Sequence, residues 1–320
     1  MIERLEITGY RGIARGDLPS LAPLTVLVGP NNSGKSSVLE ALYLAGAAGD
    51  GAAIARIGTR RGWIGLASLP AWLRSGQALL RWRAGDSEVL LTLSARGERV
   101  ESSGPLISRA GYATFAESRG WASNSSSVQS IEELPAFIEP QAIGLDPALL
   151  DEAVSRADLV GGREDLLALL RPLLPGLRDM RILQAGSRYS LHVEDGSGPP
   201  WPAAVAGDGF KKLLVLASKI AADKSGLILV EEPETYLHVG AYAQVARLFW
   251  QTINTGGPRQ VVATTHSLEM LDAIFGAPEA QLERSVLLRM SLKQGVLQSV
   301  AVPGPKVREL RAEIGEDLRR

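Results

Sequence analysis

The sequence predicts an α/β fold in which strand–helix units are separated by a long inserted region. Leu24 to Val28 is a short apolar run that passes through a glycine-rich loop into helical spacing from Lys35 to Ala45. Two later apolar runs, Leu227 to Val230 and Gln260 to Thr264, are each followed by helical spacing. We therefore expect an α/β core with a mixed sheet, a small antiparallel β-subdomain and a helical insertion.

The composition limits the class of protein. The chain has 320 residues, 45% of them hydrophobic, and a formal net charge of −1, so no global basic field attracts nucleic acid. It contains no cysteine, which excludes a disulfide framework and a cysteine-ligated zinc site. The N-terminus lacks a signal peptide, and no run reaches the roughly 18–20 apolar residues of a membrane span. We expect a cytoplasmic protein without a membrane partner.

The first half of the chain contains the less regular segments. Ile2 to Thr8 alternates as a strand does, and Gly9 to Gly16 is expected to form a turn. We expect one domain over residues 1–320, with residues 46–180 forming the inserted β-subdomain and helical lobe. Short antiparallel strands are predicted at 78–83, 88–94 and 98–102, and the polar stretch 102–130 is expected to be a mobile loop.

The second half is more periodic, and most of its elements can be predicted. Asp146-Pro147 has the form of a helix start. Helices are predicted at 149–157, 163–174, 211–222, 242–253, 268–275 and 307–318, and strand pairs at 181–185 with 189–193 and at 285–290 with 296–301.

A phosphate-binding loop is the strongest motif. It fits the pattern G-x-x-x-x-G-K-[ST], preceded by a strand and followed by a helix. Backbone amides of such a loop and the helix N-terminus bind phosphates, the lysine reaches the β- and γ-phosphates, and the serine binds Mg²⁺. A chance glycine turn is the alternative. The expected ATP-binding residues are Gly29, Pro30, Asn31, Asn32, Ser33, Gly34, Lys35, Ser36 and Ser37, with Ser36 also a metal ligand.

The apolar run that begins at Leu227 ends in two carboxylates, Glu231 and Glu232. One carboxylate can orient Mg²⁺ and the next can accept a proton from the attacking water. We assign Glu231 to the metal and Glu232 to the water. The alternative is an acidic strand end that faces solvent.

Two further motifs follow strands or open helices. Val261 to Thr264 runs into Thr265-His266-Ser267, where His266 could hydrogen-bond the γ-phosphate and hold the water. A strand-end histidine satisfied by the backbone is the alternative. Gly207, Asp208 and Gly209 open a predicted helix and could offer amides to a phosphate, or form an ordinary loop-to-helix junction. His192 is expected to be structural, and for His238 a structural role and a dimer contact are left open.

In the chain the order is phosphate loop, signature-like turn, acidic strand and histidine turn. Four motifs in this order resemble the ABC ATPase superfamily of P-loop NTPases. Within it the chain is similar to the RecF and SMC branch, and most similar to OLD-type (AAA15/AAA21-like) ATPases without a Toprim nuclease domain. Beyond the phosphate loop, the resemblance rests on 7–12, on Glu232-Pro233-Glu234 with Leu237-His238, on 264–269 and on 313–319.

This resemblance implies an ATP-stabilised homodimer with two ATP molecules and Mg²⁺ at its interface. Gly207, Asp208 and Gly209 would then contact the γ-phosphate bound by the other subunit. Ala206 stands where many signatures place serine, and Glu231 where aspartate is usual. Gln141 is the candidate for the metal-contacting glutamine, with Gln129 as the alternative, and Tyr10 or Arg11 is expected near the adenine.

The expected function is an ATP-hydrolysing dimerisation switch that controls a separate effector, such as a nuclease or toxin, in DNA repair or antiphage defence. A non-hydrolysing ATP-binding scaffold and a transporter nucleotide-binding subunit are the alternatives. Nucleic-acid binding is left open, because arginines at 56, 60, 61, 74, 81 and 83 lie among Trp63, Trp72 and Trp82. A solvated face over a tryptophan-containing core explains that pattern equally well.

Overall fold

The computed structural model describes residues 1–61, 72–96, 99–104, 112–116, 120–124, 134–139, 147–185, 188–235, 237–254 and 257–319. Its strands are β1 (Arg4–Tyr10), β2 (Ile13–Leu18), β3 (Leu24–Val28), β4 (Gln77–Ala84), β5 (Ser87–Arg96), β6 (Arg99–Ser103), β7 (Tyr112–Ala116), β8 (Gly120–Asn124), β9 (Ala136–Ile138), β10 (Asp179–Ala185), β11 (Arg188–Glu194), β12 (Trp201–Pro202), β13 (Leu227–Glu231), β14 (Gln260–Thr264), β15 (Ser285–Lys293) and β16 (Val296–Pro303).

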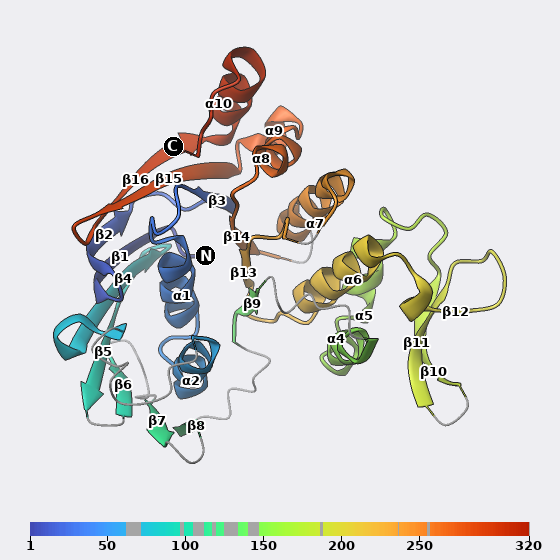
Figure 1. The fold of residues 1–320 in the computed structure, drawn as a ribbon, viewed down its shortest axis with the longest axis horizontal. Helices are drawn as coiled ribbons and strands as arrows, with labels where there is room; N and C mark the ends of the chain where they lie inside the picture. Colours follow the sequence, from blue (N-terminus) through green and yellow to red (C-terminus); the bar gives the residue numbers. More distant parts are fainter. Residues whose placement is uncertain are drawn as a thin grey trace.

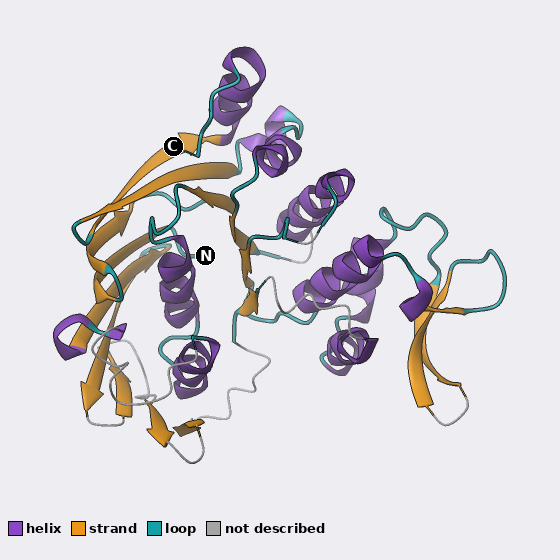
Figure 2. Ribbon diagram, viewed as in Figure 1, coloured by secondary structure: helices purple, strands orange, loops and turns teal. Residues whose placement is uncertain are grey.

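Helices occupy the two faces of the sheet (Figure 2). The α-helices are α1 (Lys35–Gly46), α2 (Gly51–Arg60), α4 (Pro147–Leu159), α5 (Arg163–Leu170), α6 (Asp208–Ala221), α7 (Tyr242–Asn254), α8 (Leu268–Phe275), α9 (Glu279–Leu282) and α10 (Gly304–Glu309), and a π-turn, η7 (Leu310–Ile314), follows α10. In the described part of the chain, no helix has the length and apolar composition needed to cross a membrane.

One large mixed sheet organises the molecule. Within the described residues it has 13 strands in the order β8-β7-β6-β5-β4-β1-β2-β16-β15-β3-β14-β13-β9, and β10, β11 and β12 form a separate antiparallel sheet. β3 is parallel to β14 and β15, and β13 is parallel to β14 and β9. In Figure 1 the large sheet curls around α1 and α2, and α6 and α7 lie on its other side. The predicted α/β class with a mixed sheet is confirmed.

The central strands are buried on both faces because their apolar residues alternate between two cores. Residues 24, 26, 28, 228, 230, 261 and 263 pack with α6, α7 and α8 in the first core. Residues 27, 227, 229 and 262 pack with α1 and with β1 and β4 in the second. A continuous apolar run is the pattern expected for such parallel strands.

Most predicted elements are present, and the differences have local causes. The expected turn at 9–16 includes the first part of β2, which begins at Ile13. The sequence of β2 shows little alternation, but the strand pairs with β1 and buries Ile13 and Leu18 at its ends. The helix predicted at 307–318 continues past Glu309 as a π-helical turn and is wrong beyond Ile314, where Gly315 in the left-handed region caps it.

The insertion at residues 46–180 contains more structure than the sequence indicated. Helix α2 was not predicted, and β7 and β8 lie within the stretch expected to be a loop. The rest of 105–130 lies outside the described residues. Because β4 pairs with β1, the antiparallel strands β4 to β8 continue the main sheet. The domain boundaries at 46 and 180 stay a prediction.

Candidate active site

Three strand ends bring the predicted motifs together. β3, β14 and β13 are adjacent and parallel, so their carboxyl ends lie at one edge of the sheet, where ligands bind in open α/β folds. The phosphate loop follows β3, the acidic motif follows β13 and the histidine turn follows β14. They enclose an open cleft of about 650 Å³. The described residues that line it are Arg11, residues 31–37, Arg61, Glu232, Thr264 and His266.

The phosphate loop is shaped by close backbone contacts. Gly29 has φ 149°, and a Cβ on it would lie 2.3 Å from the carbonyl oxygen of Met290 in β15. The N-cap of α1 is Gly34, with no side-chain capping bond, so no side chain competes for the amides of the first turn. These amides and the helix dipole can therefore bind an anion in the cleft.

Lys35 is held across the loop. Its Nζ donates hydrogen bonds to the carbonyl oxygens of Gly29 at 2.9 Å and Pro30 at 3.0 Å. Neither of these two residues is among the described residues that line the cleft. The side chain is buried at 7% exposure. Burial lowers the pKa of Lys35, while the carboxylates of Glu232 and Glu231 act to raise it. A desolvated ammonium at this position is suited to a phosphate.

Glu232 and His266 face each other across the cleft. His266 Nε2 lies 3.3 Å from Glu232 Oε1, and the two side chains are 35% and 38% exposed. Glu232 has φ 45°, in the left-handed region, and its N–H donates to Thr264 Oγ1 at 3.1 Å. A non-glycine residue in this region is strained and such strain clusters at functional sites. Both side chains remain accessible to a ligand.

Glu234 fixes the loop that carries His266, a role that was not assigned from the sequence. Its Oε1 accepts hydrogen bonds from Thr265 Oγ1 at 2.7 Å and from the backbone N–H of His266 at 2.8 Å. Its Oε2 is buried without a hydrogen-bond partner among the described residues. The Glu-Pro-Glu spacing, which puts a second carboxylate two residues after Glu232, was the available signal.

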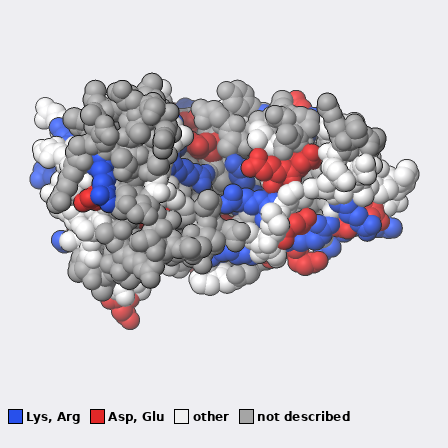
Figure 3. Space-filling model, turned by 90° about the horizontal axis from the view of Figure 1, so that it is seen from below, with Lys and Arg blue, Asp and Glu red and all other residues white. Residues whose placement is uncertain are grey.

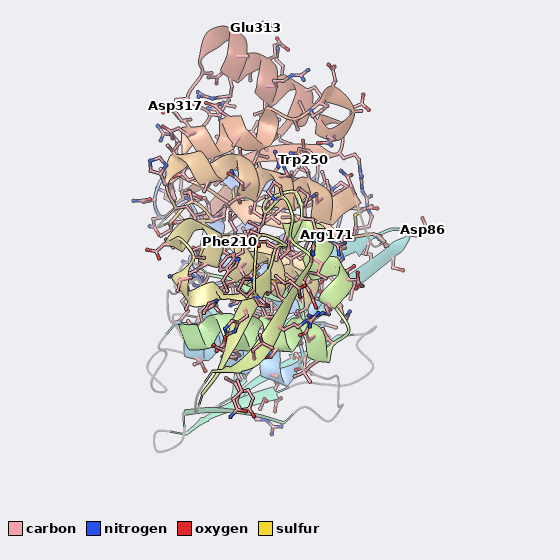
Figure 4. All side chains as sticks on the ribbon, turned by 90° about the vertical axis from the view of Figure 1, so that its right-hand side faces the viewer. Asp86, Arg171, Phe210, Trp250, Glu313 and Asp317 are labelled. Carbon is pink, nitrogen blue, oxygen red and sulfur yellow. The ribbon has the colours of Figure 1, made fainter. Side chains whose placement is uncertain are left out.

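A C-terminal segment contacts the same loop. Arg319 Nη1 donates to the carbonyl oxygen of His266 at 3.0 Å, and its Nε donates to Asp317 at 2.9 Å. Figure 4 shows Asp317 and Glu313 in this segment, in the upper part of the molecule. Leu318 is fully buried in the first core. The segment is therefore packed in place and binds the carbonyl group of His266, whereas Glu234 binds the N–H of the same residue.

Glu231 lies next to the cleft but is already paired. Its carboxylate forms an ion pair with Arg60, and it is not among the described residues that line the cleft. Its assignment to the metal stays a prediction. In the described part of the chain, no three His, Asp or Glu side chains are placed to hold a metal ion by themselves. Ser36 and one carboxylate fit a Mg²⁺ that takes its other ligands from phosphate and water.

Glu40 connects the arginines of the cleft wall. This carboxylate is fully buried, and it accepts hydrogen bonds from Arg11 at 2.8 Å and Arg61 at 2.5 Å. Tyr10 is buried at 0% exposure and its hydroxyl points to Glu40 at 3.3 Å. Of the two residues named as alternatives for the adenine contact, Arg11 lines the cleft and Tyr10 does not, and the contact itself stays a prediction. An acid within the apolar helix sequence around Leu39 was the signal for Glu40.

The signature-like turn lies at the start of α6, outside this cleft. Gly207, Asp208 and Gly209 are not among the described residues that line it. Gly207 and Asp208 are exposed, and no described atom lies within 4 Å of a Cβ built on either glycine. Their predicted contact with a second subunit's nucleotide stays a prediction.

The remaining candidates give mixed results. Gln141, Gln129 and Trp63 lie outside the described residues. Trp72 and Trp82 are buried, at 0% and 7% exposure, so they cannot stack on bases. His238 is exposed and its Nδ1 accepts from the N–H of Gly240, and His192 Nδ1 lies 3.0 Å from the Ser190 carbonyl oxygen.

The chain matches two protein families by sequence. Residues 24–69 and 115–272, more than half of the chain, match the family described as "AAA domain, putative AbiEii toxin, Type IV TA system". Residues 1–46 match the family described as "AAA ATPase domain".

Individual relatives are matched over shorter segments. The uncharacterized protein MJECL11 of Methanocaldococcus jannaschii is 28% identical over 113 residues, which are 35% of this chain and 98% of that protein. DNA replication and repair protein RecF of Proteus mirabilis is 48% identical over 46 residues, which are 14% of this chain and 13% of RecF.

Solved structures share the fold over nearly the whole chain. The SMC head domain from Thermotoga maritima has 15% identity and a TM-score of 0.53, covering 94% of this chain and 98% of that one. The Pyrococcus furiosus Smc head bound to the C-terminal domain of ScpA has 13% identity and a TM-score of 0.52, covering 98% and 99%. The chain therefore shares the fold of SMC head domains, and it belongs to the family described as "AAA domain, putative AbiEii toxin, Type IV TA system".

Proposed function

We propose that the chain hydrolyses ATP and that ATP drives a dimerisation switch which controls a separate partner. One observation carries the proposal: Lys35, Ser36, Glu232 and His266 line or border a single cleft at the ends of adjacent parallel strands. This cleft combines an anion-binding loop with a carboxylate and an imidazole 3.3 Å apart. Such an arrangement suits phosphoryl transfer to water, which depends on positioning and electrostatic stabilisation.

The residues have separate roles in this proposal. The loop amides and Lys35 bind the phosphates, and Ser36 offers its hydroxyl to Mg²⁺. Bound Mg²⁺ would neutralise charge on the phosphate oxygens. Glu232 accepts a proton from the attacking water, and His266 hydrogen-bonds the γ-phosphate while its contact with Glu232 orients that carboxylate. Arg11 adds positive charge to the wall of the cleft.

A dimer would place the signature-like turn on the partner's nucleotide. The open space around Gly207 and Gly209 supports this, because nothing in the described part of the chain occupies it. The turn also opens α6, a helix of 14 residues whose N-cap has no side-chain hydrogen bond. Its first amides are therefore available to a phosphate. Ala206 lacks the hydroxyl that a serine would contribute.

The setting and the partner are proposed from the relatives. RecF is named a DNA replication and repair protein, the matched family is named for a toxin of a type IV toxin–antitoxin system, and two similar SMC heads are bound to parts of ScpA. These names support a role in DNA repair or antiphage defence with a separate effector. In Figure 3 positive and negative residues are interspersed over the described part of the visible face.

Replacing Glu232 by glutamine tests the central assignment. Removal of a general base typically costs about 10²–10⁴-fold in rate, so Glu232→Gln should lose phosphate release by that factor and keep ATP binding. With hydrolysis blocked, the dimer should accumulate with ATP in light-scattering measurements. Glu279→Gln, at an exposed carboxylate paired with Arg308, is the control. Phosphate release at the wild-type rate in Glu232→Gln would remove Glu232 from this role.

A non-hydrolysing ATP-binding scaffold is the second candidate. The ion pair between Glu231 and Arg60 favours it, because the acid assigned to the metal is already neutralised. Phosphate release from the wild-type protein, measured with and without DNA, separates the two functions.

A further inference from the structure

Arg60 is a buried cation that joins three acidic side chains. It is the last residue of α2, and its side chain is 8% exposed. Its guanidinium contacts the carboxylates of Glu40 in α1, Glu139 just after β9 and Glu231 at the end of β13. Its Cζ also lies 4.5 Å from the centre of the Phe137 ring. One side chain therefore ties the inserted helix to three elements beside the cleft.

The contact with Glu231 matters most. Glu231 ends the strand whose next residue is Glu232, and its side chain is only 13% exposed. Charges in such a partly buried place interact strongly, because little water screens them. A carboxylate whose charge is already shared with a guanidinium has a weakened attraction for a second cation. Arg60 contacts Oε2 of Glu231, so the ion pair reduces the negative charge that Glu231 offers to a divalent ion.

We propose that Arg60 is a resident counter-ion that controls whether Glu231 is available to a divalent cation. The proposal rests on the proposed function, since it assumes that a nucleotide with its metal occupies the cleft. It adds a positioning residue that comes from the inserted helix. Metal binding at Glu231 is thereby coupled to α2, a helix that packs against β7 and β8.

The neighbouring arginines do not share this role. Arg61 and Arg11 reach only Glu40 among these acids, and both line the cleft. Arg56, one turn earlier in α2, donates to the carbonyl oxygen of Phe137 at 2.9 Å. Arg56→Gln is therefore a matched control: it removes the same charge from the same helix and leaves the ion pair with Glu231 intact.

The test measures Mn²⁺ affinity rather than turnover. Mn²⁺ is titrated by electron paramagnetic resonance into the protein with a non-hydrolysable ATP analogue, and analogue binding is measured separately in EDTA. Arg60→Gln should bind Mn²⁺ about tenfold more tightly than the wild type, because it frees the Glu231 carboxylate. The double variant Arg60→Gln with Glu231→Gln should lose this gain, and Arg56→Gln should match the wild type.

Removing a buried partner can also destabilise the fold. If Arg60→Gln does not fold, Arg60→Lys takes its place, because it keeps one charge but cannot span three acids; its expected gain is about threefold. Equal Mn²⁺ affinity in the wild type and the folded Arg60 variant, with analogue bound to both, overturns this inference alone. No analogue binding to any variant in EDTA overturns the proposed function as well.

Discussion

Replacing Glu234 by alanine should disconnect the loop that carries His266. Its Oε1 accepts two hydrogen bonds, from Thr265 and from the backbone of His266. Hydrogen bonds to charged groups contribute about 1.5–3 kcal/mol each. We take the lower value because Glu234 is only partly buried. Loss of both bonds therefore costs the loop about 3 kcal/mol of stabilising free energy. This corresponds to a factor on the order of a hundredfold in the equilibrium between its ordered and disordered states.

The expected result is a fall of about a hundredfold in kcat with little change in KM for ATP, because Glu234 does not line the cleft. Phosphate release at saturating ATP measures this. Glu234→Gln keeps a carbonyl oxygen as acceptor, so it should lose no more than about tenfold. Circular dichroism should show a folded protein, since Arg319 still holds the loop. A kcat for Glu234→Ala within threefold of the wild type would refute the reasoning.

Three further perturbations test other parts of the structure. Gly29→Ala should lower the free energy of unfolding by about 2 kcal/mol or more, because its Cβ would lie 2.3 Å from the Met290 carbonyl oxygen; an unchanged urea midpoint would contradict this. Arg319→Ala removes one charged hydrogen bond to His266 and should lower kcat about tenfold. Phosphate release at the wild-type rate in this variant would contradict that expectation. Burial raises the pKa of Asp223 above 3.8, so the folded state binds the proton more tightly than the unfolded state. As pH falls through the raised pKa toward 3.8, the wild type should gain unfolding free energy relative to Asp223→Asn, and a constant difference across that range in urea titrations would exclude this effect.

The sequence predicted the parts of the site that are local in the chain. The phosphate loop from Gly29 to Ser37 is contiguous, and strand ends that carry Glu232 and His266 could be recognised from their apolar runs. Parallel pairing of those strands then places them at one edge. The interpretation therefore depended on local patterns and one general rule of sheet topology.

Long-range polar pairs could not be predicted in the same way. Arg60 and Glu231 are separated by 171 positions, and nothing in either local sequence names the other. Glu40 was unremarked although it stands in an apolar helix. Tyr10 was named with Arg11 as an alternative for the adenine contact, and its burial in a core with Trp72 and other distant residues could not be predicted. Such contacts depend on how the insertion folds back on the core, and periodicity carries no information about that.

The central strands have a consequence for how the molecule comes apart. β3, β13 and β14 pack one of their faces into the first core and the other face into the second, so the two cores share these three strands. Loss of packing on one face removes the support of the other, and neither half retains a complete sheet alone. Heat or urea should therefore melt the two halves in a single cooperative transition.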